Sequence, residues 1–287
     1  MAVLEATDGT TQKSEQLETT FAVAGKVRSM DGTAITFERR GCGSPVILVD
    51  GALCYRGMGQ SGKLAELLEP HFTVFTYDRR GRGASGDTAP YSVEREVEDL
   101  AALVIEAGGN AYVWGMSSGG ALALEAARRL SGIRKLGLYE VPFIVDNTRS
   151  STEGDWERIG AAIAAGRRSE GVKLFLKSVG VPGFFRLLMP LMRPVWRKLK
   201  AVAHTLPYDG AIVSDNQRGK PLPADRWACV SAATLVMDGG KSPAWMRNGN
   251  QALAAILPNA QHRTLQGQTH LLKPKAHLPA LVEFFRS

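Results

Sequence analysis

Short apolar runs that alternate with helix-like stretches constrain the fold of this chain more than any other feature of its sequence. Six such runs lie after residue 45, at 46–50, 72–78, 111–115, 135–140, 234–239 and 262–267. The amphipathic stretch 92–109 is typical of the intervening segments, with Ser92 as a candidate N-cap and Glu94 and Glu96 in its first turn. Apolar strands that alternate with helices predict a largely parallel sheet covered by helices on both faces.

The sequence divides into a core and one insertion. Residues 20–28 and 33–39 alternate with a period of two around Ser-Met-Asp-Gly, which is typical of a β-hairpin. From 142 to 227 no run resembles a buried strand, and the helical patterns there are interrupted by prolines. We therefore expect a polar tail at 1–18, a core at 19–141 and 228–287, and an inserted helical cap at 142–227.

Composition excludes several classes of function. With 287 residues, 44% of them hydrophobic and 22% charged, the chain has the composition of a globular protein that can bury a site. Its three cysteines form no Cys-x-x-Cys pair, so neither a disulfide framework nor a zinc site is indicated. The N-terminus lacks the apolar stretch of a secretory signal, and no window approaches the roughly 18 apolar residues of a membrane span. A cytoplasmic protein is expected.

Positive charge gathers in the expected cap. The formal net charge is +7, and nine basic residues lie between Arg167 and Lys200 beside the single acid Glu170. No nucleic-acid-binding motif accompanies them, so nucleic acid is not an expected partner. A solvated helix face explains such a run. The alternative is a surface that attracts anionic substrates toward the site entrance.

Three glycine motifs could mark a site, and one has a suitable context. The G-x-G-x-x-G match at 81–86 precedes no helix that could receive a pyrophosphate. The P-loop-like run at 57–63 is followed by Leu64, which cannot bind Mg²⁺. The sequence GMSSG at 115–119 ends an apolar run and begins a helix-forming stretch. This strand–turn–helix is what a nucleophile elbow requires, so Ser117 is the candidate nucleophile.

A serine nucleophile needs a base, and the base needs an acid that orients it. Of the five histidines, His270 lies in a loop directly after the last expected strand, at the sheet edge where sites of open α/β folds form. His262 begins a strand, and His277 is expected on the exposed side of a terminal helix. Asp238 ends the preceding strand and is the expected acid. Glu140, which ends the run 135–140, is the alternative, although such carboxylates more often cap helices or form salt bridges.

Two backbone N–H groups should stabilise the oxyanion of the tetrahedral intermediate. One is expected from Ser118, the residue after the nucleophile. The other is expected from the loop after 46–50, where we assign Ala52, with Gly51 and Leu53 as neighbouring alternatives.

With these residues placed, the chain resembles the bacterial α/β-hydrolase superfamily from about residue 20 to its end. The resemblance is carried by the order and spacing of VILVDGAL (46–53), YDRRGRGASGD (77–87), WGMSSGG (114–120), LVMDGGKSPAWM (235–246) and GQTH (267–270). It implies an α/β-hydrolase fold with an eight-stranded sheet and a helical cap over the site. It also implies Asp238 as the acid and catalysis without metal or organic cofactor. Many relatives have histidine where this chain has Asp50 and Met116.

The expected activity is cleavage of a carboxylic ester or lactone of a small apolar substrate through an acyl-enzyme on Ser117. The same triad serves thioester, amide and C–C hydrolysis and cofactor-free perhydrolysis. A hydrolase-fold receptor with little turnover is the alternative from another class. In the cap, most apolar side chains at 184–189, together with Met192 and Trp196, are expected to pack the cap onto the sheet, with a few facing an apolar pocket.

Overall fold

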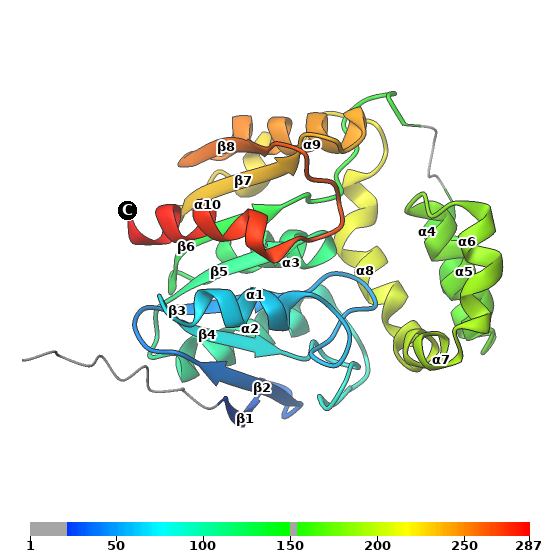
Figure 1. The fold of residues 1–287 in the computed structure, drawn as a ribbon, viewed down its shortest axis with the longest axis horizontal. Coiled ribbons are helices and arrows are strands. Elements are labelled where there is room, and N and C mark those ends of the chain that lie inside the picture. Colours follow the sequence, from blue (N-terminus) through cyan, green and yellow to red (C-terminus); the bar gives the residue numbers. More distant parts are fainter. Residues whose placement is uncertain (1–21, 150–153) are drawn as a thin grey trace, which may run out of the picture.

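The computed structural model describes residues 22–149 and 154–287, so the expected tail at 1–18 lies outside the described residues. Eight strands form one sheet in the order β1-β2-β4-β3-β5-β6-β7-β8 (Figure 1). They are β1 (Val23–Arg28), β2 (Ala34–Arg40), β3 (Pro45–Val49), β4 (Thr73–Tyr77), β5 (Ala111–Met116), β6 (Ile133–Tyr139), β7 (Ala233–Gly239) and β8 (Ala260–Leu265). The pairs β1·β2 and β2·β4 are antiparallel and the other pairs are parallel, which confirms the predicted sheet.

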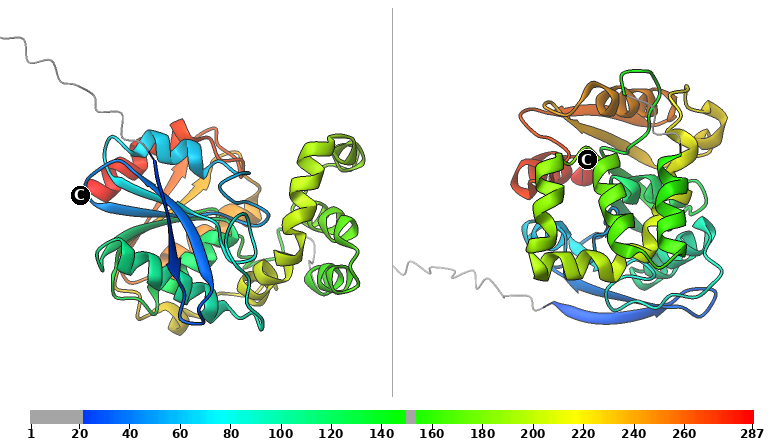
Figure 2. Two further views of the ribbon diagram at one scale, coloured as in Figure 1. Left: turned by 90° about the horizontal axis from the view of Figure 1, so that it is seen from below. Right: turned by 90° about the vertical axis from the view of Figure 1, so that its right-hand side faces the viewer.

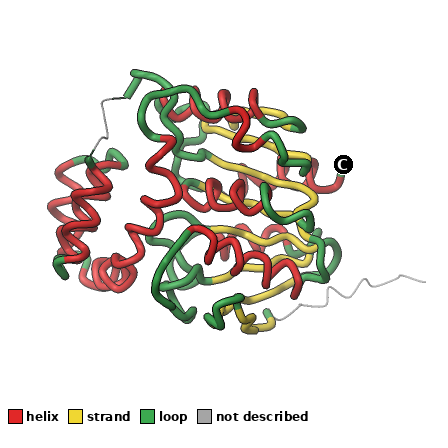
Figure 3. Tube along the Cα trace, turned by 180° about the vertical axis from the view of Figure 1, so that it is seen from behind, coloured by secondary structure: helices red, strands yellow, loops and turns green. Residues whose placement is uncertain are grey.

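Helices cover both faces of this sheet (Figures 1 and 3). One face packs against α1 (Ser61–Leu68) and α10 (Pro274–Arg286), and the other against α2 (Val93–Glu106), α3 (Ser118–Ala127) and α9 (Ala244–Ile256). The strands are apolar on both sides because both sides are buried. In β5, Val113 belongs to the core under α2 and α3, whereas the next residue, Trp114, belongs to the core under α1 and α10.

The segment between β6 and β7 forms helices and turns wherever it is described. Four helices, α4 (Asp155–Ala164), α5 (Arg168–Ser178), α6 (Gly183–Leu188) and α7 (Arg193–Val202), form a lobe beyond the carboxyl edge of the sheet (Figures 1 and 2). After α7 the chain returns to the core through α8 (Leu206–Val213), which contacts α2 and α3. Short 3-10 turns complete the segment at Met189–Leu191, Ala203–Thr205, Ser214–Asn216 and Ala224–Trp227.

The apolar side chains of α6 do not pack the cap onto the sheet, so that prediction is wrong for most of them. Phe184 is 67% exposed, Phe185 60% and Leu187 75%. The cap instead meets the core through Trp196 of α7, which is buried in one cluster with Leu53 from the loop after β3. The outer surface of α6 therefore remains apolar and open to solvent.

Candidate active site

Ser117 lies in a sharp turn between β5 and α3. Its backbone has φ 53° and ψ −132°, a conformation that residues other than glycine rarely adopt and that is concentrated at functional sites. The turn is tight because α3 begins against the end of β3. A Cβ atom at Gly119 would lie 2.4 Å from the carbonyl oxygen of Asp50. This geometry is that of a nucleophile elbow, and it brings Ser117 to the carboxyl edge of the sheet.

Four of the five predicted site residues line one cavity between the core and the cap. Ser117, Ser118, Ala52 and His270 are all part of its wall, and its volume is about 140 Å³. A cavity of this size holds several waters and admits a small substrate group. The cap contributes aromatic walls, among them the side chains of Trp156 and Phe175.

The carboxylate that contacts His270 is Glu140. The Nδ1 atom of His270 lies 2.7 Å from Oε2 of Glu140, which is fully buried. The other oxygen, Oε1, accepts hydrogen bonds from the Gly239 N–H at 2.8 Å and from the Ser242 hydroxyl. Glu140 follows β6 with φ 47°, so the chain turns sharply at this residue. Both carboxylate oxygens are thus fixed, and one of them holds the histidine ring.

Asp238 contacts a different histidine, so the prediction that it pairs with His270 is wrong. The strand β7 continues through Gly239, which leaves Asp238 inside the strand rather than in the loop beyond it. Asp238 is in register with Thr264 of β8, and His262 lies two residues from Thr264, so the two side chains project from the same face of the sheet as diagonal neighbours. Its Oδ2 atom lies 2.8 Å from Nε2 of His262. Asp238 is absent from the residues that line the cavity of Ser117.

His277 supports the loop that carries His270 and is buried, contrary to the expectation that it is exposed. Its Nδ1 donates to the Lys273 carbonyl at 3.0 Å, and its ring packs edge-on against Tyr139 at 4.3 Å between centroids. The Tyr139 hydroxyl donates to the Thr269 carbonyl at 2.6 Å. Burial lowers the pKa of His277, which favours the neutral ring that this packing requires.

The loop after β3 lies directly against the elbow. A Cβ atom at Gly51 would lie 3.1 Å from the Cβ of Ser117, so glycine permits this approach. Ala52 follows and lines the cavity. Ser118 is the first residue of α3, where an N–H group has no partner within the helix. Ala52 and Ser118, the residues predicted to supply the oxyanion hole, therefore both line the cavity of Ser117.

Buried ion pairs fix the loop and the elbow from behind. Arg82 donates to the Gly51 carbonyl at 2.7 Å, and Arg79 to the Asp50 carbonyl at 3.2 Å. Both guanidinium groups bond to Asp209 of α8, at 2.7 Å from Arg82 and 2.9 Å from Arg79. The Ser118 hydroxyl also donates to Asp209, at 2.8 Å.

The charge on Asp209 is retained in this buried position. Burial opposes its ionisation, but Arg82 and Arg79 hold the pKa of Asp209 below its ordinary value. Sequence analysis identified neither Asp209 nor Arg82 as part of the site.

Asp50 directly follows β3 and precedes the loop of Gly51 and Ala52. It is buried and accepts a hydrogen bond from the Ser61 hydroxyl. Burial raises the pKa of Asp50 to about 6, although the hydrogen bond from Ser61 and the charge of Arg82 act in the opposite direction. A protonatable carboxyl group therefore lies immediately before the oxyanion loop.

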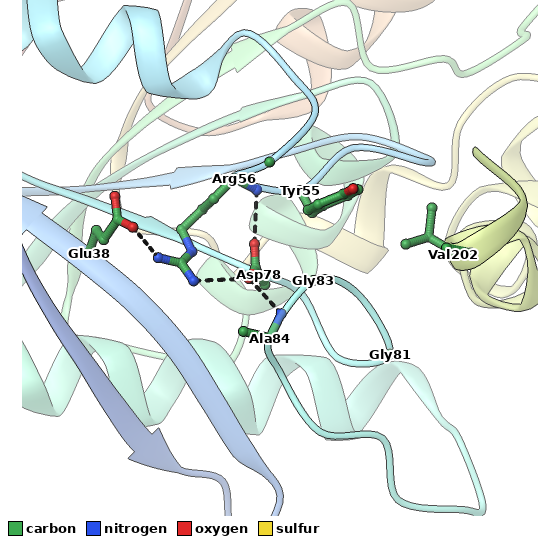
Figure 4. Close-up of a pocket in the computed structure, with 10 residues that line it drawn as sticks. Glu38, Tyr55, Arg56, Asp78, Gly81, Gly83, Ala84 and Val202 are labelled. Atoms are coloured by element: carbon green, nitrogen blue, oxygen red, sulfur yellow. Dashed lines mark hydrogen bonds and ion pairs between the residues drawn. The ribbon is translucent and has the colours of Figure 1, made fainter. Parts of the chain in front are cut away.

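A second and larger cavity lies elsewhere between the loop after β3 and the cap (Figure 4). Its volume is about 550 Å³, and Glu38, Tyr55, Arg56 and Asp78 are among the residues that line it. Arg56 forms ion pairs with both Glu38 and Asp78, so each of these three charged groups has a partner of opposite charge. Neither Ser117 nor His270 lines this cavity, and it lacks a nucleophile–base pair.

Within 22–149 and 154–287, no group of three or more His, Cys, Asp or Glu side chains could hold a metal ion. Over the same ranges, no helix combines the length and apolarity needed to cross a bilayer.

The sheet order, the strained turn at Ser117 and the helices inserted between β6 and β7 define an α/β-hydrolase fold. The chain belongs to the alpha/beta hydrolase family, whose sequence model matches residues 43–281.

Solved structures agree with this assignment. An alpha/beta hydrolase from Sphaerobacter thermophilus DSM 20745 is 51% identical, with a TM-score of 0.83 over 91% of this chain and 100% of that one. A hydrolase from Pseudomonas aeruginosa PA01 is 24% identical, with a TM-score of 0.71 over 92% and 98% of the two chains. A thermophilic esterase from Thermogutta terrifontis is 23% identical, with a TM-score of 0.63 over 92% and 98%. The last two similarities concern the fold alone.

Proposed function

We propose that this protein is a serine hydrolase that cleaves a carboxylic ester or lactone of a small substrate. The observation that carries the proposal is the pair of His270 and the buried Glu140, 2.7 Å apart, on the cavity that also contains Ser117. Ser117 is the nucleophile, His270 the general base, and Glu140 the acid that orients and stabilises the imidazole. Family membership and the likeness to hydrolases support the reaction class.

In this mechanism the Ser117 hydroxyl attacks the carbonyl carbon while Nε2 of His270 takes its proton. The negative charge that develops on the carbonyl oxygen is stabilised by the N–H groups of Ser118 and Ala52. Breakdown of the tetrahedral intermediate releases the alcohol, which receives its proton from His270. Water, activated by the same histidine, then attacks the acyl-enzyme and releases the acid. Glu140 stabilises the imidazolium in both half-reactions.

The test is hydrolysis of a p-nitrophenyl ester with a short acyl chain, measured in the steady state. We expect sustained turnover that a serine-directed fluorophosphonate abolishes, with the label on Ser117. Ser117→Ala should lower the rate by about 10⁴-fold or more while leaving the melting temperature near that of the wild type. A single burst of nitrophenol with negligible turnover would instead identify a hydrolase-fold receptor. Parallel assays with thioester and amide substrates separate ester hydrolysis from other acyl transfers.

A further inference from the structure

An arginine lies in the wall of the cavity that contains Ser117. Arg149 belongs to the loop that follows β6, and it lines the cavity together with Ser117 and His270. Its guanidinium carbon lies 4.3 Å from the centre of the Trp245 ring, and it donates a hydrogen bond to the Ser178 carbonyl. Contacts with α9 on one side and α5 on the other therefore hold the cation in position. A guanidinium group that is stacked on an aromatic ring retains its other N–H groups for a ligand.

Arg149 forms no ion pair with any residue that the structure describes. The buried arginines of the core differ in this respect, since Arg79, Arg80 and Arg82 each have a carboxylate oxygen within 2.9 Å. Burial lowers the pKa of Arg149, which reflects the cost of placing this cation away from water.

The nearest acid on the cavity wall does not fill this role. Asp155 favours the charged form of Arg149 at longer range, but its carboxylate is bonded to Arg158 at 2.6 Å. The rest of the wall is largely apolar, with Trp156 and Phe175 from the cap and Met246 from α9. A partly desolvated guanidinium beside apolar walls binds a carboxylate strongly, because the charge-assisted hydrogen bonds compete with little water.

We propose that Arg149 binds a carboxylate of the substrate, so that the site selects esters or lactones that carry a free carboxylate close to the bond that is cleaved. This inference rests on the proposed ester hydrolysis and names its substrate class. Because Ser117 and Arg149 line the same cavity, a short linker joins the two groups in the proposed substrate. Monoesters of short dicarboxylic acids have this chemistry, with the carbonyl at Ser117 and the carboxylate at Arg149.

The first experiment compares p-nitrophenyl hydrogen glutarate with p-nitrophenyl pentanoate, which differ only by a carboxylate in place of a methyl group. In the wild type, kcat/KM should be higher for the hemiester, and the difference should lie mainly in KM. Arg149→Met should lower the ratio of the two kcat/KM values by about 10- to 100-fold, since hydrogen bonds to charged groups are of that strength. Arg149→Lys should fall between, because it keeps the charge but loses the planar pair of donors.

The matched control is Arg197→Met, which makes the same substitution at an exposed arginine of α7. If the basic cap merely attracts anions, this variant lowers the ratio as much as Arg149→Met, and both effects disappear at about 1 M salt, where the Debye length is about 3 Å. Our proposal predicts instead that Arg197→Met leaves the ratio within about twofold and that the effect of Arg149→Met persists in high salt.

A binding measurement separates this inference from the proposed catalysis. Ser117→Ala protein is titrated with monomethyl glutarate and with methyl pentanoate, and Trp fluorescence is recorded because Trp245 stacks on Arg149. Saturable binding of the hemiester that Arg149→Met abolishes supports the carboxylate site, even if no ester is turned over. Hydrolysis of both esters with an unchanged ratio in Arg149→Met, together with equal binding of both ligands, would overturn it and leave ester hydrolysis standing.

Discussion

The structure contains two histidine–carboxylate pairs at neighbouring strands, and they differ in what surrounds them. His270 pairs with Glu140 at 2.7 Å, and His262 pairs with Asp238 at 2.8 Å. Both carboxylates are fully buried. Only the first pair borders the cavity that contains Ser117. A short contact between a histidine and a carboxylate therefore does not by itself define a catalytic pair, since the histidine must also reach a nucleophile.

The two carboxylates also differ in how firmly they are held. The second oxygen of Glu140 accepts bonds from the Gly239 N–H and the Ser242 hydroxyl. The second oxygen of Asp238 has no hydrogen-bond partner among the residues that are described. A histidine that acts as a general base must be held in one ring orientation. Glu140 can hold His270 in this way, because both of its carboxylate oxygens have hydrogen-bond partners. We infer that the His270–Glu140 pair serves catalysis, whereas the His262–Asp238 pair stabilises the packing of β7 against β8.

Replacing each of the two histidines by alanine should give the largest difference in kcat between the two pairs. His270→Ala removes the general base, and we expect kcat for a neutral ester to fall by about 10⁴- to 10⁶-fold. His262→Ala should change kcat by less than about threefold, because no reacting group contacts this ring. Steady-state assays of both variants test the assignment. If His262→Ala is the inactive one, the roles of the two pairs are reversed.

Substitution of the carboxylates should give the next largest effect. Glu140→Gln keeps the shape of the side chain but cannot stabilise the imidazolium, so kcat should fall by about 10³- to 10⁴-fold. The matched variant Asp238→Asn should retain kcat within about threefold, because it makes the same chemical change at the other pair. Equal losses in the two variants would contradict the distinction. Thermal unfolding of both proteins confirms that each is folded during the assay.

A third buried carboxyl group, that of Asp50, accepts a hydrogen bond from the Ser61 hydroxyl rather than from a histidine. We expect it to make the stability of the protein depend on pH. Its pKa rises from 3.8 to about 6 on folding, so the folded protein retains the proton more strongly than the unfolded chain. The associated stability is complete below pH 3.8 and is lost as the pH rises through about 6. The shift corresponds to about 3 kcal/mol in the free energy of unfolding.

Asp50→Asn removes this ionisation. Relative to the wild type, the free energy of unfolding of the variant should therefore increase by about 3 kcal/mol between pH 4 and pH 7. Urea denaturation of both proteins at several pH values measures the difference. Parallel stability curves for the two proteins would show that Asp50 is already ionised at pH 4 in the folded state.

The smallest expected effect concerns the structural role of the second pair. Asp238→Ala should lower the free energy of unfolding by about 1–3 kcal/mol, because it leaves His262 without its partner and opens space in a buried region. Asp225→Ala, at an exposed position, is the control and should change stability by less than about 0.5 kcal/mol. Urea denaturation at one pH is sufficient. A stable Asp238→Ala protein would mean that the pair has no structural function.

The strands and the elbow could be predicted because their signals are local. A buried parallel strand is a continuous apolar run, and the glycines around Ser117 mark the tight turn between β5 and α3 in the sequence itself. His270 was accessible to the same reasoning, since a loop after the last strand must lie at the carboxyl edge of the sheet.

The acid could not be chosen in this way. Its identity depends on whether a strand ends one residue earlier or later. Asp238 and Glu140 both lie near the end of a strand, but β7 continues to Gly239 while β6 ends at Tyr139. Glu140 is thereby free to turn toward the loop of His270.

Other parts of the site depend on contacts between distant segments. Asp209 is 130 residues from Arg79 in the chain and bonds directly to it. Arg149 can be recognised as a candidate binding residue only from the structure, which places it on the cavity wall without an ion pair to any described residue. No local pattern carries that information.

The hydrogen bonds and ion pairs of Asp209 limit how much of the segment between β6 and β7 can be replaced by another sequence. The helix α8 lies within the inserted segment by sequence, yet its carboxylate holds two arginines of the core and the second serine of the elbow. Replacement of the whole segment between β6 and β7 would leave Arg82 buried without its carboxylate, at a cost of about 3–5 kcal/mol, and would leave Arg79 with Glu96 alone. We therefore expect a chimera whose foreign lobe is joined ahead of the turn Ala203–Thr205 to keep these bonds, together with the bond of Arg82 to the Thr205 hydroxyl at 3.1 Å.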